Sequence, residues 1–285
     1  MESNPVERFP ERYSELYEPS MRRRLIEPVR DLAVSLMSPL ASAAYHIRYA
    51  RVNHVRFVYY HFVFGDQASR FAEHLRFYRD NYRVISHSEA ISRLRDGRVD
   101  DRYLSISFDD GFKNNAEVAA PILEQFGMPA IFFVVANLMK FSPGEESELE
   151  SFSRSRFGHR PLRNMDRDDL RRLLAGGHEI GSHTLSHARL SNTTLAVAER
   201  EIAQSRTVLE EMTGSPVKHF CFPYGLAADF PAHCRDMVER AGYQSCVSAI
   251  RGANQAGADV YHLRRDHIMA NWPISQLKYF TRTNF

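Results

Sequence analysis

The sequence predicts an α/β protein built on a parallel β-sheet. Strand-like and helix-like segments alternate from Val55 onward, and strands that alternate with helices favour parallel pairing through right-handed crossovers. One segment, Ala130–Val135, is apolar without interruption, as expected for a strand that is buried on both faces of a parallel sheet. Counting the strand-helix units gives about seven, which is consistent with a (β/α) barrel.

Each expected element rests on its hydrophobic pattern. Alternating apolar residues predict strands, and apolar stripes at helical spacing that end near Gly or Pro predict helices. The expected strands are 55–63, 82–85, 104–108, 130–135, 178–180, 220–222, 246–250 and 261–268. The expected helices are 68–78, 88–94, 116–126, 165–175, 193–212, 231–241 and a closing helix after Trp272.

Two adjacent carboxylates follow the expected strand 104–108. Asp109 and Asp110 stand directly before Gly111, where the chain can turn tightly toward the next helix. The carboxyl ends of strands are where α/β proteins carry their chemistry, and alternation along the strand directs the two side chains differently. Taken alone, this motif fits a solvated loop pair equally well. If a second motif elsewhere in the sequence supplies further ligands, the Asp109-Asp110 pair predicts two carboxylates with different roles.

Such a motif lies downstream, where His183 and His187 are four residues apart. At this separation, one helical turn or a tight loop aims two imidazoles at one point. Two histidines and one carboxylate form the open ligand set of a hydrolytic metal site, in which the metal lowers the pKa of a coordinated water. His178-Glu179 does not begin a zinc-protease motif, because Ser182 stands where its second histidine would be.

A third motif, Cys221-Phe222-Pro223-Tyr224, ends another short apolar strand. Together with Ser107-Phe108-Asp109-Asp110-Gly111 and His183-Thr184-Leu185-Ser186-His187, it resembles the three motifs of the polysaccharide deacetylases of carbohydrate esterase family 4, the NodB homology domain. The third motif of that family begins with arginine, where this sequence has Cys221. The resemblance covers roughly residues 55–280 and implies a distorted seven-stranded (β/α) barrel.

The resemblance implies a metal-dependent hydrolase that removes N-acetyl groups from amino sugars of a polysaccharide, oligosaccharide or lipid-linked glycan. Asp110, His183 and His187 are then expected to bind a divalent metal, with Zn²⁺ the first choice for nitrogen and oxygen ligands. Asp109 is expected to be the base that takes a proton from the attacking water. By the same resemblance, Pro223 and Tyr224 are expected at the substrate, with the Tyr224 backbone N–H at the oxyanion.

The general acid has no clean motif in this sequence, because the family's closing Leu-x-His lacks a direct counterpart. Leu263-Arg264-Arg265-Asp266-His267 lies in the corresponding part of the chain. There His267 is the candidate for the acid, with a core or surface histidine as the alternative, and Arg265 is expected to orient Asp109. His262 is a weaker candidate, and His61, after Tyr59-Tyr60, is expected at the rim of the pocket.

Two further function classes stay open at this point. By the same resemblance, wider relatives with this fold include deformylases of sugar lipids and amidases of small cyclic amides. A catalytically inactive glycan-binding protein is the other alternative, although the intact Asp-Asp and His-x-x-x-His motifs speak against it. Release of acetate from an acetylated glycan distinguishes the deacetylase from both.

Composition limits the partners. The 285 residues suit one large α/β domain or two small ones, and a hydrophobic content of 44% supports a sizeable core. A net charge of +2 gives no electrostatic case for nucleic acid as a partner, and no G-x-G-x-x-G or Walker motif supports a nucleotide site. Three cysteines without a C-x-x-C pair are expected to be buried thiols in a reducing compartment.

Residues 1–54 are expected to form a helical or irregular extension, and residues 55–285 the catalytic domain. Basic residues at 21–25 and apolar residues at 32–37 faintly resemble a signal peptide, but Glu27, Asp31 and Pro39 interrupt the pattern. We expect an amphipathic helix that packs on the domain or, as the second choice, contacts a membrane surface. No apolar run reaches about 18 residues, so nothing is expected to span a bilayer. The cytoplasm or its membrane face is the expected location.

The segment 137–163 is polar and is predicted to be a long irregular loop. A loop after the carboxyl end of a strand lies on the active-site face of a barrel. We therefore hypothesise that it forms a lid or a sugar-binding wall, with a solvated insertion as the equally weighted alternative.

Overall fold

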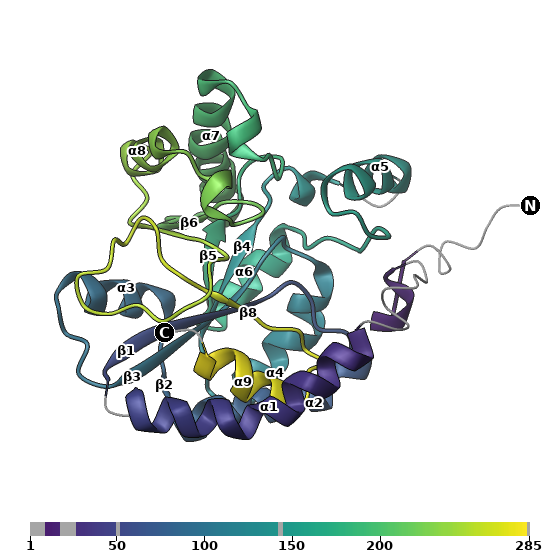
Figure 1. Cartoon of the computed structure of the whole chain (residues 1–285). Helices are drawn as coiled ribbons and strands as arrows, with labels where there is room; N and C mark the ends of the chain where they lie inside the picture. Colours follow the sequence, from purple (N-terminus) through teal and green to yellow (C-terminus); the bar gives the residue numbers. More distant parts are fainter. Residues whose placement is uncertain (1–8, 18–26, 50–51, 142–144, 284–285) are drawn as a thin grey trace, which may run out of the picture.

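The computed structural model describes residues 9–17, 27–49, 52–141 and 145–283. A curved, parallel β-sheet with helices packed around it forms an incomplete (β/α) barrel (Figure 1), so the predicted fold class is confirmed. The strand order is β7-β6-β5-β4-β3-β1-β8, and β2 pairs with β3. The strands are β1 (His54–Tyr60), β2 (Arg83–Val84), β3 (Arg102–Phe108), β4 (Ala130–Val134), β5 (Glu179–Ser182), β6 (His219–Cys221), β7 (Ser245–Val247) and β8 (Asp266–His267).

The central strands are buried on both faces, which explains their apolar sequences. Every residue of β1 and β4 is buried, because helices cover one side of the sheet and barrel side chains fill the other. The rings of Phe108 and Phe132 stack at 5.0 Å between β3 and β4. The helices are α1 (Glu27–Arg48), α2 (Ala68–Asn81), α3 (His87–Arg95), α4 (Ala120–Gln125), α5 (Glu146–Arg156), α6 (Arg167–Ala175), α7 (Leu195–Thr213), α8 (Ala232–Arg240) and α9 (Ile274–Thr283).

Residues 263–268 join the two edges of the sheet. At one end, Leu263 exchanges backbone hydrogen bonds with the end of β7, and at the other, the Ile268 N–H donates to the Tyr59 carbonyl of β1 (2.9 Å). The prediction of one continuous strand over 261–268 is therefore wrong, because the segment changes partners halfway and only Asp266–His267 is a strand. Arg265 lies within this crossing and is buried.

The segment 137–163 is not an irregular loop throughout, because it contains helix α5. Leu149 and Ser153 of this helix are buried, and Glu150 pairs with Arg154 one turn later at 2.9 Å. Pairs of this spacing stabilise a helix. The charges that the sequence interpretation assigned to a solvated loop are the outer face of a short helix.

Several other expectations concern the whole chain. The three cysteines, Cys221, Cys234 and Cys246, are buried and unpaired, as predicted. Helix α1 falls in the expected N-terminal extension and packs along α9; the basic residues 21–25 lie outside the described residues. Among the helices in the described ranges, none combines the length and the apolar character needed to cross a membrane.

The buried His74 makes the stability of the protein depend on pH. Its Nε2 donates to the Trp272 carbonyl (2.7 Å) and its Nδ1 accepts from the Tyr60 hydroxyl (3.1 Å), which fixes a neutral ring. Burial lowers the pKa of His74 to about 4. Unfolding returns this pKa to about 6.5, so the unfolded state binds more protons below that pH and the free energy of unfolding falls as pH falls. We expect a loss of about 2 kcal/mol from this residue between pH 6.5 and 5.

Urea denaturation of the wild type and the His74→Gln variant at these two pH values measures this contribution. The variant is less stable at neutral pH, but its stability should fall less steeply toward pH 5. If both proteins lost the same free energy of unfolding on acidification, titration of His74 would not contribute to the pH dependence.

Candidate metal centre and active site

The two carboxylates stand at a sharp turn after β3. The Asp109 N–H still donates to the Tyr60 carbonyl of β1 (2.9 Å), as in a sheet. Asp110 then has φ 74° and Gly111 φ 91°, so the chain leaves the sheet at once. A Cβ at Gly111 would lie 2.9 Å from the Val134 side chain, which explains the glycine. The turn sends the two carboxylates toward different partners.

Asp110 faces the two histidines of the second motif. Its Oδ1 lies 3.5 Å from His183 Nε2 and 3.4 Å from His187 Nε2, and one ligand atom from each of the three residues lies within 4.8 Å of the others. All three side chains are buried. The structure thus brings together two segments that are more than 70 residues apart in the sequence.

This group fits a divalent cation. Ligands that each lie about 2.1 Å from a tetrahedral zinc are about 3.4 Å apart, which matches the two measured separations. Asp110 Oδ1 is buried without a hydrogen-bond partner, and burial together with the Asp109 charge raises its pKa well above the usual value. A buried carboxyl with no hydrogen-bond partner and a raised pKa is one that a nearby positive charge would stabilise, and a metal ion supplies that charge.

The histidines are held in the form that binds a metal. His183 Nδ1 donates to the Cys221 carbonyl (2.8 Å), which leaves the Nε2 lone pair directed at Asp110. Burial lowers the pKa of His183 to about 4 and that of His187 well below its usual value. Both rings are therefore neutral at neutral pH, as ligation requires.

Asp109 is paired with Arg265. The guanidinium donates from Nη1 to Oδ1 and from Nη2 to Oδ2, each at 2.8 Å, and its Nε donates to the Ser248 carbonyl. The Tyr59 ring lies beneath the guanidinium at 4.1 Å. Burial acts to raise the pKa of Asp109, but the Arg265 charge outweighs it and lowers this pKa to about 2. Asp109 is therefore ionised at neutral pH.

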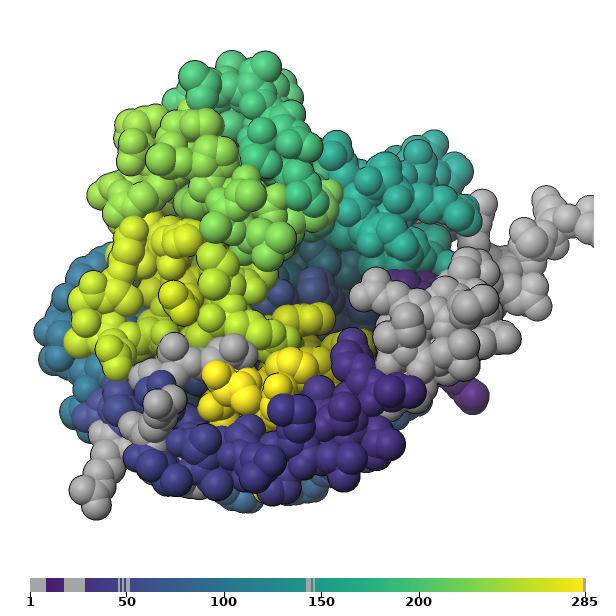
Figure 2. Space-filling view, viewed as in Figure 1, coloured from purple at the N-terminus to yellow at the C-terminus, as the bar shows by residue number. Residues whose placement is uncertain are grey.

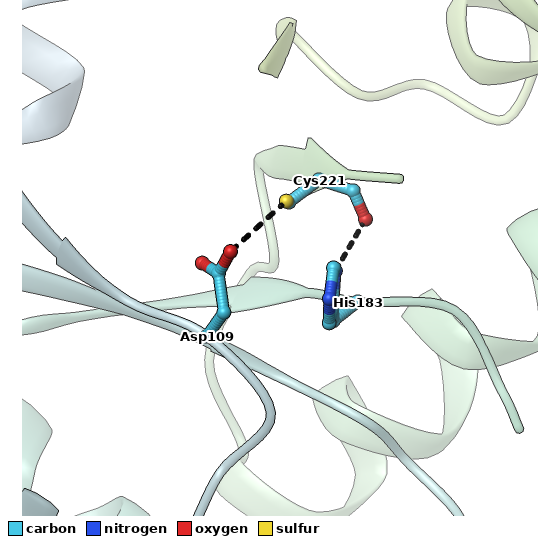
Figure 3. Close-up of side chains that lie close together, drawn as sticks. All are labelled: Asp109, His183 and Cys221. Carbon is cyan, nitrogen blue, oxygen red and sulfur yellow. Dashed lines mark hydrogen bonds between the residues drawn. The ribbon is translucent and has the colours of Figure 1, made fainter. Parts of the chain in front are cut away.

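A second group of possible ligands, Asp109, His183 and Cys221, lies beside the first (Figure 3). The Cys221 thiol is 3.8 Å from Asp109 Oδ2 and 2.9 Å from Arg265 Nη2. Both Asp109 oxygens are engaged by Arg265, and burial raises the pKa of Cys221 well above its usual value, so the thiol is protonated. The group around Asp110 is the better cation site, because its ligand atoms are not committed elsewhere.

Backbone strain is concentrated in the three motifs. Among the described residues, the non-glycine residues with positive φ are Asp110, Thr184, His187 and Tyr224. This conformation is costly for a side chain with a Cβ, and it persists at sites that the surrounding structure fixes for function. The strain thus points to the same place as the ligand geometry.

Two histidines contact each other near the carboxylates. His61 Nδ1 lies 3.1 Å from His267 Nε2, and both residues line the cavity that contains Asp109 and Asp110. Burial lowers the pKa of both rings. His262 instead stacks with Phe222 and Phe230 and does not line this cavity.

The cavity has a volume of about 260 Å³ and opens over the three motifs. Tyr224 lines it with 40% of its surface exposed, while Pro223 is buried between two lining residues. One wall combines aromatic residues of two segments remote from the motifs, which we call the aromatic wall: Tyr13, Tyr17, Phe157 and His159.

Sequence reasoning found the carboxylates and histidines and hypothesised a wall in 137–163, the segment that contributes Phe157 and His159, but it missed Tyr13 and Tyr17. Tyr17 packs edge-on against His159 with ring centres 6.0 Å apart, and Tyr13 contacts Phe62 at 6.0 Å. Aromatic residues at 13 and 17 carry no spacing signal that separates a cavity wall from ordinary core. Only the folded structure shows that they line the cavity.

Several known proteins are similar to this chain. The protein YxkH of Bacillus subtilis (strain 168), whose name assigns it to the polysaccharide deacetylases, is 24% identical over 197 residues, 68% of this chain and 62% of its own length. The chain therefore spans less than two thirds of that relative. Among solved structures, the Streptococcus pyogenes deacetylase PplD in complex with acetate superimposes with a TM-score of 0.64 at 17% identity, covering 80% of this chain and 96% of PplD.

IcaB from Ammonifex degensii superimposes with a TM-score of 0.63 at 19% identity, and the superposition covers 81% of this chain and 97% of IcaB. At such identities these structures establish the fold. The sequence profile described as polysaccharide deacetylase matches residues 96–246, which include all three motifs and more than half of the 285 residues. By this match, the chain belongs to the polysaccharide deacetylase family.

Proposed function

We propose that this protein is a metal-dependent hydrolase that removes N-acetyl groups from amino sugars of a glycan. The observation that carries the proposal is the convergence of Asp110, His183 and His187 on one point beside the ionised Asp109. Polysaccharide deacetylation is the activity for which the family is named. The alternatives, a deformylase or cyclic amidase and an inactive glycan-binding protein, are outcomes of the test below.

Asp110, His183 and His187 would hold the metal. A divalent cation in such a site, most simply Zn²⁺, polarises a carbonyl and makes water more acidic. Asp109 accepts the proton of the attacking water, because its carboxylate is ionised and adjacent to the ligands. Arg265 orients this carboxylate through its two parallel hydrogen bonds.

The amide nitrogen that leaves must gain a proton. The His61–His267 pair lines the cavity that contains Asp109 and Asp110, with His61 Nδ1 3.1 Å from His267 Nε2, so a proton can pass between the rings and on to the leaving nitrogen. We assign the acid role to His267, with His61 as its hydrogen-bonded partner. The Tyr224 N–H is assigned to the oxyanion, and its ring to the sugar.

Acetate release combined with metal analysis tests the proposal. Purified protein should contain about one divalent ion per chain and release acetate from N-acetylglucosamine oligomers. Consumption of a small cyclic amide without acetate release would assign the protein to the amidases instead. Protein that binds the oligomers but contains no metal and releases no acetate would be the inactive binding protein.

Two alanine variants test the acid separately. His267→Ala and His61→Ala should each lower turnover while the metal content stays unchanged. If His267→Ala kept full turnover and His183→Ala lost it, the acid assignment would be wrong and the metal assignment would stand.

The aromatic wall predicts how the substrate is held. Aromatic faces pack against the apolar faces of sugar rings, and Tyr13 and Tyr17 line the cavity that contains the metal ligands. We expect the Tyr13→Ala/Tyr17→Ala double variant to raise KM for N-acetylglucosamine oligomers about tenfold with kcat less affected, because lost uniform binding appears in KM. Tyr279→Ala, on α9 and outside the cavity lining, is the matched control. An unchanged KM would exclude the wall from substrate binding.

A further inference from the structure

Helix α1 packs its polar side on the protein and exposes its apolar side. Ser35 shares a hydrogen bond with Ser275 (3.0 Å) and Ser42 accepts one from Arg282 (2.8 Å), both partners lying on α9. Ser38 and Tyr45 are buried on the same side. The large apolar side chains lie on the outside, with exposed fractions from 51% to 86%: Val29, Leu32, Leu36, Met37, Leu40 and Ile47.

The exposed residues form one continuous stripe. Residues 29, 32, 36, 40 and 47 recur at the three-, four- and seven-residue steps that align side chains along one face of a helix. Figure 2 shows α1 (purple) running along the surface beside α9 (yellow). This polarity is the reverse of that of an ordinary surface helix. Contiguous exposed apolar residues mark a surface that binds an apolar partner.

The charge of the sequence that contains α1 identifies the kind of partner. Residues 21–51 contain six arginines against Glu27 and Asp31, an excess of four positive charges. The whole chain has a net charge of only +2, so the remaining residues are net negative. A basic segment with an apolar helical face is the signature of a helix that lies in the interface of an anionic membrane.

We propose that α1 docks the protein on an anionic lipid bilayer, with the stripe of Val29, Leu32, Leu36, Leu40 and Ile47 inserted between the headgroups. The 22 residues of α1 extend about 33 Å and lie flat along the protein, which suits insertion parallel to the membrane. Pairing with a second copy through the same face is disfavoured, because a two-fold contact would bring two arginine-rich segments together. This docking is independent of the proposed activity.

Co-sedimentation with vesicles tests the docking. The wild type should pellet with vesicles of phosphatidylglycerol and phosphatidylcholine, and less with phosphatidylcholine alone or at high salt, which screens the charge. The double variant Leu36→Glu/Leu40→Glu should bind at least about tenfold more weakly, because it places two charges in the inserted face. Leu195→Glu, at the start of α7 and 60% exposed, is the matched control and should bind like the wild type.

Circular dichroism and acetate release check that the variants are folded. Equal binding of the wild type and the double variant, or no binding of the wild type to anionic vesicles, would overturn the proposal. If the wild type were a dimer that did not bind vesicles, and the double variant were a monomer, the proposal would also be overturned. A second copy of the chain would then be the occupant of the stripe.

Discussion

The His187→Ala variant is expected to lose its bound metal and with it at least about 10³-fold in turnover, since a catalytic metal supplies several kcal/mol of transition-state stabilisation. His187 Nε2 lies 3.4 Å from Asp110 Oδ1, and its removal leaves two ligands, too few for a stable site.

The Asp109→Asn variant separates the base from the ligands. It should retain the metal and still lose about 10² to 10⁴-fold in turnover, because a general base contributes that much.

Metal content by mass spectrometry and acetate release from N-acetylglucosamine oligomers measure both variants side by side. His219→Gln is a useful control, because this buried histidine hydrogen-bonds Ser88 and Ser245 away from the metal ligands. It should keep both metal and activity if the protein folds. A His187→Ala variant with full metal content would refute the ligand assignment, and an Asp109→Asn variant with full turnover would refute the base.

The sequence predicted the convergence of the motifs because of how parallel sheets are built. Asp109 follows β3 and His183 follows β5, with β4 between these two strands, and the carboxyl ends of parallel strands lie at the same edge of the sheet. The Asp-Asp-Gly and His-x-x-x-His spacings then suffice to bring three ligand atoms together. Local patterns therefore predict local geometry on a regular scaffold.

The sequence could not predict features that depend on distant packing. The family resemblance led us to expect Arg265 at Asp109, but hydrophobic alternation does not reveal how it gets there, because residues 263–268 change partners between β7 and β1. The helical periodicity of α1 predicts an amphipathic helix, but periodicity does not say which face meets the protein. The charged α5 was mistaken for a loop because its single buried leucine gives a weak stripe.

Replacement of Arg265 by methionine should have the largest effect on stability of any change at the site. It leaves the Asp109 carboxylate buried without its cation, and breaking a buried pair from one side costs about 3–5 kcal/mol. The pKa of Asp109 then rises from about 2, because burial no longer has an opposing charge. Since the base acts in its ionised form, the acidic limb of the pH dependence of kcat/KM should move to higher pH.

Arg265→Lys distinguishes charge from geometry. Lysine keeps a positive charge near Asp109 but cannot form the two parallel hydrogen bonds that now hold both oxygens at 2.8 Å. Its acidic limb should therefore stay close to that of the wild type while turnover falls, because the carboxylate is ionised but poorly oriented. If both variants kept the wild-type pH profile and turnover, Arg265 would be a structural residue. The lowered pKa of Asp109 would then have to come from the metal site.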